Sequence, residues 1–243
     1  MTYSVNAQSI NPYYTSRMIE PDITFAVIPA GPKNASPVPH LTSLYHHTEP
    51  GDYGDRSYPG NCGGNLIRDL LMYFRPANVF DPMTGSGTCR DVCRELGIPC
   101  DSTDLKQGFD ACDPDSFTSD QQYEFIWTHP PYWRMKEYST NANDLSRAPN
   151  LDVFLVRYGQ FIRNCAKSLR PGGKLAVLMG DYLDREAGFV PLTYFTKFIA
   201  FDAGLKQECT DIIRFSHGAS SSRKIYRSSF IPGLHDVCAI FTN

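Results

Sequence analysis

The sequence predicts an α/β fold, in which a mostly parallel sheet carries helices on both faces. Apolar segments of strand length alternate with amphipathic segments of helix length, and this alternation is typical of parallel sheets. Gly, Pro and Asp residues mark the ends of several of these segments, as expected where the chain turns. The length of 243 residues fits one α/β domain with a decorated end better than two full domains.

The composition excludes several classes of protein. Hydrophobic residues make up 42% of the chain and charged residues 20%, which is not the composition of a disordered protein. No apolar run approaches the roughly 20 residues that a membrane helix needs. The first residues lack the basic start and apolar stretch of a signal peptide. We therefore expect a soluble, cytoplasmic protein with no membrane partner.

The eight cysteines form no C-x-x-C pair and lie at no zinc-binding spacing with a histidine. Cys89 and Cys93 are four residues apart, which places them on one face of a helix, but two ligands alone do not make a metal site. We expect reduced thiols that pack as small hydrophobic side chains, in keeping with a reducing compartment, and no metal.

The chain divides near residue 57. Residues 1–57 contain only short apolar runs and are expected to form an irregular N-terminal extension, with one strand at 23–28. Residues 58–243 show the regular alternation of a folded domain.

The first half of this domain combines two helices with three strands. The first predicted helix is 64–74, where apolar residues recur at helical spacing. The second is 88–96, which Gly97 ends as a left-handed cap. The predicted strands are 79–80, 98–105 and 123–128.

The second half begins with an amphipathic helix at 151–169. A Pro-Gly-Gly turn then leads into a buried strand at 174–179. A helix follows at 191–201, and apolar segments at 212–215 and 237–241 are predicted to close the sheet.

The first segment with chemical meaning is DPMTGSGT, residues 81–88, between a predicted strand and a predicted helix. Ligands of doubly wound sheets bind at this end of the strands. Gly85 and Gly87 allow the backbone to bend sharply and to approach a ligand closely. At the end of the next strand, the carboxylate of Asp104 can accept hydrogen bonds from ribose hydroxyls. The alternative for Asp104 is a helix cap or turn residue.

The second segment is THPPYW, residues 128–133, directly after the strand at 123–128. Two adjacent prolines fix the backbone and donate no hydrogen bond, so the local carbonyls act as acceptors. This arrangement suits a planar ring that stacks on Tyr132 while its exocyclic amine donates to Pro130 and His129. A simple turn or an interaction peptide is the alternative.

Together, DPMTGSGT and THPPYW resemble the motifs of the DNA amino-methyltransferases, which use S-adenosylmethionine to methylate adenine N6 or cytosine N4. The resemblance covers roughly residues 58–241, including the helix GNLIRDLLMYF and the segments LRPGGKLAVLMGD and LHDVCAIF. It implies a Rossmann-like class I methyltransferase fold with a seven-stranded, mostly parallel sheet. It also implies that residues 58–243 are the catalytic domain and that the base flips out of the duplex.

The resemblance implies a role for each matching residue. The expected contacts to S-adenosylmethionine come from Asp81, Met83, Thr84, Gly85, Gly87, Thr88, Asp104, Leu105 and Asp110. The expected contacts to the target base, and hence the catalytic groups, come from His129, Pro130, Pro131 and Tyr132.

His129 departs from the family pattern, which has Asp, Asn or Ser at this position. A neutral imidazole still offers one acceptor nitrogen, whereas a protonated one does not. Activity is therefore expected to fall as the pH drops through the titration of His129, near about 6.5 for an ordinary histidine. The likeness of THPPYW to the TSPPYW of cytosine-N4 enzymes favours cytosine slightly over adenine.

DNA is the expected partner, although no separate recognition domain is evident. The stretch from 212 to 230 contains four basic residues and no acidic one. The candidate recognition segments are the loop 134–150, the N-terminal extension and this basic stretch. The stretch is favoured for phosphate contacts, through its cations Arg214, Arg223, Lys224 and Arg227. A solvated surface loop is the alternative, and a homodimer or a separate specificity partner remains open.

Other functions compete with this one. The chain could methylate RNA or a protein glutamine, or it could be a catalytically weak, methyltransferase-like module that binds nucleic acid. A dinucleotide-dependent dehydrogenase is disfavoured, because Arg90 stands where the third glycine of G-x-G-x-x-G would be.

Overall fold

The computed structural model describes residues 35–47, 51–118, 122–215, 231 and 233–243. These residues belong to a unit that spans residues 31–243. The strand expected at 23–28 lies outside the described residues, as do Arg223, Lys224 and Arg227.

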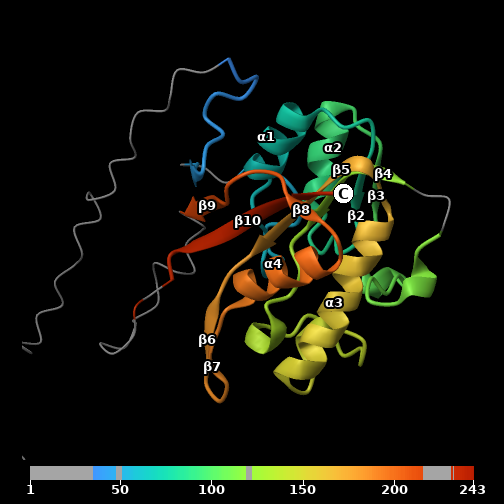
Figure 1. Cartoon of the computed structure of the whole chain (residues 1–243), viewed down its shortest axis with the longest axis vertical. Coiled ribbons are helices and arrows are strands. Elements are labelled where there is room, and N and C mark those ends of the chain that lie inside the picture. Colours follow the sequence, from blue (N-terminus) through green and yellow to red (C-terminus); the bar gives the residue numbers. More distant parts are fainter. Residues whose placement is uncertain (1–34, 48–50, 119–121, 216–230, 232) are drawn as a thin grey trace, which may run out of the picture. The chain divides into compact units, whose positions relative to one another are not determined.

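A mixed, mostly parallel sheet of eight strands forms the centre of the fold (Figure 1). Seven strands form a continuous path, and in spatial order they are β1 (Leu44–His46), β9 (Ile212–Phe215), β10 (His235–Thr242), β5 (Leu169–Met179), β4 (Tyr123–Thr128), β2 (Val79–Asp81) and β3 (Cys100–Ser102). The eighth strand, β8 (Lys206–Gln207), pairs with β10. Strands β5, β4, β2 and β3 are parallel to one another, whereas β10 is antiparallel to β5, β8 and β9.

In the described residues, four α-helices cover the two faces of this sheet, as the alternation of strands and helices predicts. The apolar sides of α1 (Asn65–Phe74) and α2 (Thr88–Leu96) form one core with sheet residues such as Ala176 and Leu178. The apolar sides of α3 (Leu151–Lys167) and α4 (Leu192–Asp202) form the second core on the opposite face. Successive residues of β5 alternate between the two cores because side chains of a strand point to opposite faces.

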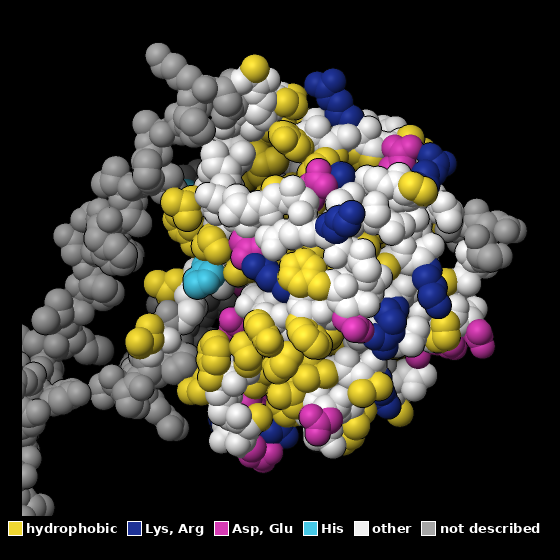
Figure 2. All heavy atoms as spheres, viewed as in Figure 1, with side chains coloured by type: hydrophobic (Ala, Val, Ile, Leu, Met, Phe, Trp, Pro, Cys, Tyr) yellow, Lys and Arg dark blue, Asp and Glu magenta, His cyan; other side chains and the backbone are white. Residues whose placement is uncertain are grey.

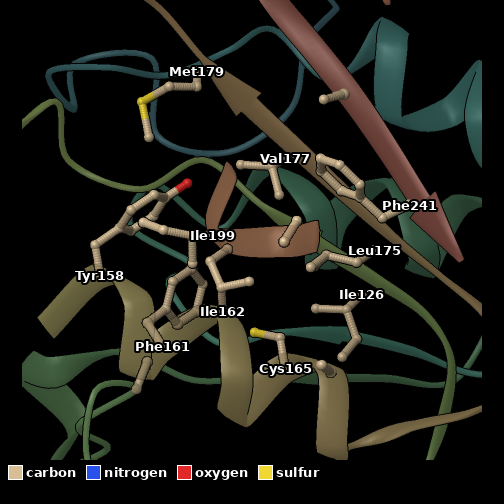
Figure 3. Packing of buried hydrophobic residues seen from close by; sticks show 14 of the residues in the cluster. Ile126, Tyr158, Phe161, Ile162, Cys165, Leu175, Val177, Met179, Ile199 and Phe241 are labelled. Carbon is tan, nitrogen blue, oxygen red and sulfur yellow. The ribbon is translucent and has the colours of Figure 1, made fainter. Parts of the chain in front are cut away.

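Figure 3 shows how the second core is packed. Tyr158, Phe161, Ile162 and Cys165 of α3 lie against Leu175, Val177 and Met179 of β5. These side chains are almost completely buried, so α3 packs closely against β5 and supports the sheet next to the ends of β4 and β5.

Short elements connect the larger ones. They are the 3₁₀ helices η2 (Leu105–Gln107), η3 (Pro114–Ser116), η4 (Trp133–Met135) and η5 (Leu145–Arg147), and the two-stranded sheet of β6 (Tyr182–Asp184) and β7 (Gly188–Val190). None of the helices in the described part of the chain has the length and apolar character that a bilayer crossing needs.

The predicted α/β fold class is confirmed, with corrections in detail. The sheet has eight strands where seven were expected. The extra strand β1 lies inside the segment expected to be irregular, and it pairs in parallel with β9, a contact that no local pattern announces. The strand expected at 98–105 is only Cys100–Ser102, because Asp104 caps η2, which begins at Leu105.

The Pro-Gly-Gly segment also behaves differently from the prediction. It lies within β5 instead of preceding the strand. Tyr123 pairs with Leu169 and Phe125 pairs with Lys174, so the residues between Leu169 and Lys174 bulge out of the ladder.

One side of the surface is rich in exposed apolar side chains. Figure 2 shows hydrophobic side chains gathered on the side that carries α4 and the β6–β7 hairpin. Leu183, Phe189, Tyr194 and Phe198 of these elements are each more than half exposed.

Candidate functional site

A tight turn follows β2 at the carboxyl end of the strand. Gly85 and Gly87 have φ angles of 48° and 81°, which favour glycine as the sequence predicts. The turn is fixed by hydrogen bonds from the Thr84 amide to the Thr103 carbonyl (2.9 Å) and from the Gly87 amide to the Thr84 carbonyl (2.8 Å). Helix α2 begins directly afterwards, so the turn presents backbone to the space above the strand.

Asp104 joins the end of β3 to this turn. Its Oδ2 accepts a hydrogen bond from the Gly85 amide, and its Oδ1 accepts one from the Lys106 amide, both at 3.0 Å. The second bond caps η2, so Asp104 is a helix cap, as the alternative interpretation of the sequence predicts. Each carboxylate oxygen has further acceptor capacity, and the residue lines the cleft described below.

Asp81 is a buried carboxylic acid at the floor of the site. Its residue is 2% exposed, and its Oδ1 accepts a hydrogen bond from the Met83 amide at 3.3 Å. Burial, followed by the nearby Cys100 thiol, raises the pKa of Asp81 well above its ordinary value. A cationic group bound here would offset the cost of ionising this carboxyl.

Residues before α1 cover the turn, although the sequence predictions assigned them no role in the site. The Asp55 amide donates to the Ser86 carbonyl at 2.8 Å, and the Gly54 amide donates to Asp91 Oδ2 at 2.9 Å. The ring of Tyr58 lies so close to Gly85 that a Cβ added there would be 3.0 Å from its Cε1. Tyr58 in turn stacks on Tyr138, with 5.9 Å between ring centroids.

The double-proline corner follows β4, which is the parallel neighbour of β2. His129 is partly exposed, and Pro130 is buried. Nε2 of His129 is 3.0 Å from the Tyr132 hydroxyl, which donates to Oδ1 of Asp236 at 3.2 Å. Burial, followed by the charge of Asp236, raises the pKa of Tyr132 well above its ordinary value, so this phenol stays protonated.

The rest of the corner is structural. Trp133 is 2% exposed, and its indole Nε1 donates to the Ala148 carbonyl at 2.9 Å. Its φ angle of 46° is rare for a residue with a large side chain, and burial of the ring holds it there. The aromatic next to Tyr132 therefore anchors the loop in the core.

Both motifs open into one cleft, with about 900 Å³ of open space that is partly continuous with solvent. The predicted site residues that line it are Asp81, Met83, Thr84, Gly85, Thr88, Asp104, Leu105, Asp110, His129 and Pro131. Gly87, Pro130 and Tyr132 do not belong to its lining, although each adjoins a residue that does. The expected stacking of a ring on Tyr132 thus stays a prediction.

Several lining residues were not found from the sequence. They come from the covering segment, from η2 and from the loop between β4 and α3, and they include, respectively, Tyr58, Lys106, and the loop residues Tyr138, Ser139 and Asn143. Their aromatic and polar types were visible in the sequence, but no spacing connected them to the glycine turn. Phe109, next to Asp110 in the sequence, also lines the cleft and packs against Phe80 of β2.

Arg214 corrects the predicted set of phosphate contacts. The residue is 9% exposed, and its guanidinium forms an ion pair with Asp236 and donates to the Cys62 carbonyl at 2.8 Å. The guanidinium of Arg214 is therefore used inside the fold, where it holds the carboxylate that accepts from Tyr132, and it is not exposed for a phosphate contact. The other three predicted cations lie outside the described residues.

A scan against models of protein families finds no match, and neither does a search of curated protein sequences. Among solved structures, a proposed DNA modification methylase of Thermus thermophilus in complex with S-adenosyl-L-methionine is 20% identical, with a TM-score of 0.39. The match covers 55% of this chain and 52% of that one, about half its length.

Two other solved structures cover more of the chain. The N-methyltransferase NodS of Bradyrhizobium japonicum, in complex with S-adenosyl-L-homocysteine, is 18% identical over 74% of this chain and 72% of that chain, with a TM-score of 0.37. A SAM-dependent methyltransferase of Archaeoglobus fulgidus is 14% identical over 73% of this chain and 93% of that chain, with a TM-score of 0.45. At these values, the matches carry no inference about substrate or reaction.

Proposed function

We propose that the chain is an S-adenosylmethionine-dependent methyltransferase that acts on an exocyclic amine of a base in DNA, with cytosine N4 slightly favoured over adenine N6. One observation carries the proposal: the glycine turn after β2 and the His-Pro-Pro corner after β4 line the same cleft. A site that brings a donor to an acceptor needs two such walls, because proximity and orientation supply much of the rate.

The cleft suits this cofactor in charge and in shape. The buried Asp81 would regain its charge beside a cationic ligand, and S-adenosylmethionine carries both an ammonium and a sulfonium group. Asp104 and Asp110, on the other side of the turn, offer carboxylate oxygens to hydroxyl and amino groups. The close approach of Tyr58 to Gly85 leaves the turn no room for a side chain, so backbone faces the ligand.

The bound cofactor would supply an electrophilic methyl group. The residues of this chain would prepare the acceptor: the Pro130 carbonyl and His129 accept hydrogen bonds from the amine and localise its lone pair. Fixed dipoles and orientation then account for most of the rate, without a strong base or a covalent intermediate. The Tyr132 hydroxyl and Asp236 hold the His129 ring in place from behind.

Recognition of DNA requires contacts to its phosphates. On the face seen in Figure 2, Lys and Arg side chains lie singly among acidic ones instead of forming one basic surface. Because Arg214 is buried in an ion pair with Asp236, we assign the phosphate contacts to the other three cations of the basic stretch, Arg223, Lys224 and Arg227.

The test is transfer of a radiolabelled methyl group from S-adenosylmethionine to DNA, RNA and protein, each offered separately to the purified chain. We expect label in DNA, and sequencing of DNA from expressing cells at single-base resolution should then identify the modified amine. Label in RNA or in a protein glutamine would replace the proposed substrate. Tight cofactor binding without transfer to any of them would favour a catalytically weak binding module.

A further inference from the structure

Three cysteines meet next to the cleft, whose lining includes Cys89, although the sequence brings together only two of them. Cys89 and Cys93 lie one turn apart on α2, and Cys100 begins β3. The three sulfur atoms lie within 4.8 Å of one another. Cys89 and Cys93 are 1% and 0% exposed, whereas Cys100 is partly exposed at the edge of the sheet.

We propose that Cys89, Cys93 and Cys100 bind one Zn²⁺ ion. Thiolates are preferred ligands of zinc, and Zn–S bonds of about 2.3 Å place the sulfurs of a tetrahedral site about 3.8 Å apart. The cluster therefore needs to contract by at most about 1 Å to close around an ion. Partial exposure of Cys100 lets water complete the fourth position.

The binding step balances without a redox partner. Zn²⁺ displaces the protons of three thiols, and the three protons leave to solvent while three Zn–S bonds form. The site has a net charge of −1, since three thiolates outweigh the charge of the ion. No oxidant or reductant takes part, and the proposal does not depend on the reaction in the cleft.

The position of the cluster gives the ion a structural task. Helix α2 starts directly after the glycine turn, and β3 leads to Asp104, which accepts a hydrogen bond from the Gly85 amide, so the two elements carry adjoining parts of one wall of the cleft. An ion shared by α2 and β3 would tie these two parts together. Binding to the folded chain alone stabilises that state by mass action, so zinc should raise the melting temperature.

The experiment measures zinc in the reduced full-length chain, first by elemental analysis after purification without chelators. The metal-free chain is then titrated with Zn²⁺ against a chromophoric chelator. The variants are C93S and C100S, and the control is C209S, which changes an exposed thiol that is not in the cluster. Circular dichroism and thermal melting check that each variant folds.

We expect one tightly bound Zn²⁺ per chain, weakened at least about 100-fold in C93S and C100S and unchanged in C209S. Absence of stoichiometric binding by the folded wild-type chain would overturn the proposal, as would equal affinity in all three variants. If either serine variant fails to fold, alkylation of the wild-type chain decides the question. Zinc should protect the partly exposed Cys100 and leave the exposed Cys209 reactive, and equal alkylation rates of Cys100 with and without zinc would refute the site.

Discussion

The hydroxyl of Tyr132 donates to Oδ1 of Asp236 at 3.2 Å, across 104 positions of the sequence. The carboxylate only accepts, so the phenol hydrogen goes to Asp236 and the phenol oxygen accepts from Nε2–H of His129. A neutral His129 then holds its proton on Nε2 and its lone pair on Nδ1. The guanidinium of Arg214 forms an ion pair with the same carboxylate.

Removal of the Tyr132 hydroxyl alone should slow the reaction. In Y132F the ring remains, but His129 loses the oxygen that fixes its tautomer and orientation, and we expect kcat to fall about tenfold. The dissociation constant for S-adenosylmethionine, measured by calorimetry, should stay the same because Tyr132 does not line the cleft. An unchanged kcat would show that the hydroxyl does not position the imidazole.

The pH profile of the activity should have an acid limb that is caused by protonation of His129. Protonation removes the acceptor lone pair of the imidazole, so activity with saturating substrates should fall towards acid pH. H129N places the residue of the resembling family at this position and should keep measurable activity without that limb. A wild-type profile that is flat from about pH 5 to 8 contradicts the role of this imidazole.

Replacement of Asp81 should separate stability from binding. The pKa of Asp81 is raised in the folded chain, so the folded chain binds this proton more tightly than the unfolded chain does. The protonated carboxyl therefore contributes to stability at low pH. This contribution is lost as the pH rises from the pKa of the unfolded chain through that of the folded chain. D81N removes this loss, and each kcal/mol recovered should raise the ligand-free melting temperature near neutral pH by roughly 2–4 °C.

The same variant should bind S-adenosylmethionine at least about tenfold more weakly, since a neutral amide attracts a cation less than a carboxylate does. Thermal melting at several pH values and calorimetry give the two readouts. A D81N chain that melts lower than wild type, or that binds the cofactor equally well, contradicts this account.

Two glycines with similar backbone strain offer a matched pair of substitutions. Gly85 and Gly97 have φ angles of 48° and 68°, so alanine costs roughly 1–2 kcal/mol of backbone strain at either position. A Cβ at Gly85 also lies 3.0 Å from Tyr58, whereas one at Gly97 meets nothing within 4 Å. G85A should therefore weaken cofactor binding and G97A should not, although both lower the melting temperature. Equal cofactor affinities in the two variants would argue against the turn as part of the site.

Arg214 and the three cations after β9 should differ in what they affect. R214Q removes the ion-pair partner of a buried carboxylate, and we expect a loss of about 3–5 kcal/mol in the free energy of unfolding. The triple variant R223A/K224A/R227A should melt like the wild type. It should bind DNA more weakly, with a salt slope reduced by about 0.9 for each phosphate that the variant no longer neutralises. A triple variant with an unchanged slope would direct the search to another surface.

The sequence by itself determined the four large helices, the central strands and the places where the site begins. Helical spacing identified the apolar side of α1, and the alternation of strand and helix placed DPMTGSGT and THPPYW at the ends of β2 and β4. These features depend on residues close together in the chain, since backbone periodicity and turn chemistry are local. Two parallel neighbours with turns at the same end then had to share an edge of the sheet.

The tertiary structure decided everything that depends on distant partners. It placed Tyr58 on Gly85, Asp236 behind Tyr132, Cys100 beside two thiols of α2, and Arg214 inside the fold. None of these pairs has a spacing or period that would mark it in advance. These residues are close because the packed sheet brings remote segments of the chain together. Burial then changes what a group can do: Arg214, which the sequence suggested as a phosphate contact, is instead the buried ion-pair partner of Asp236.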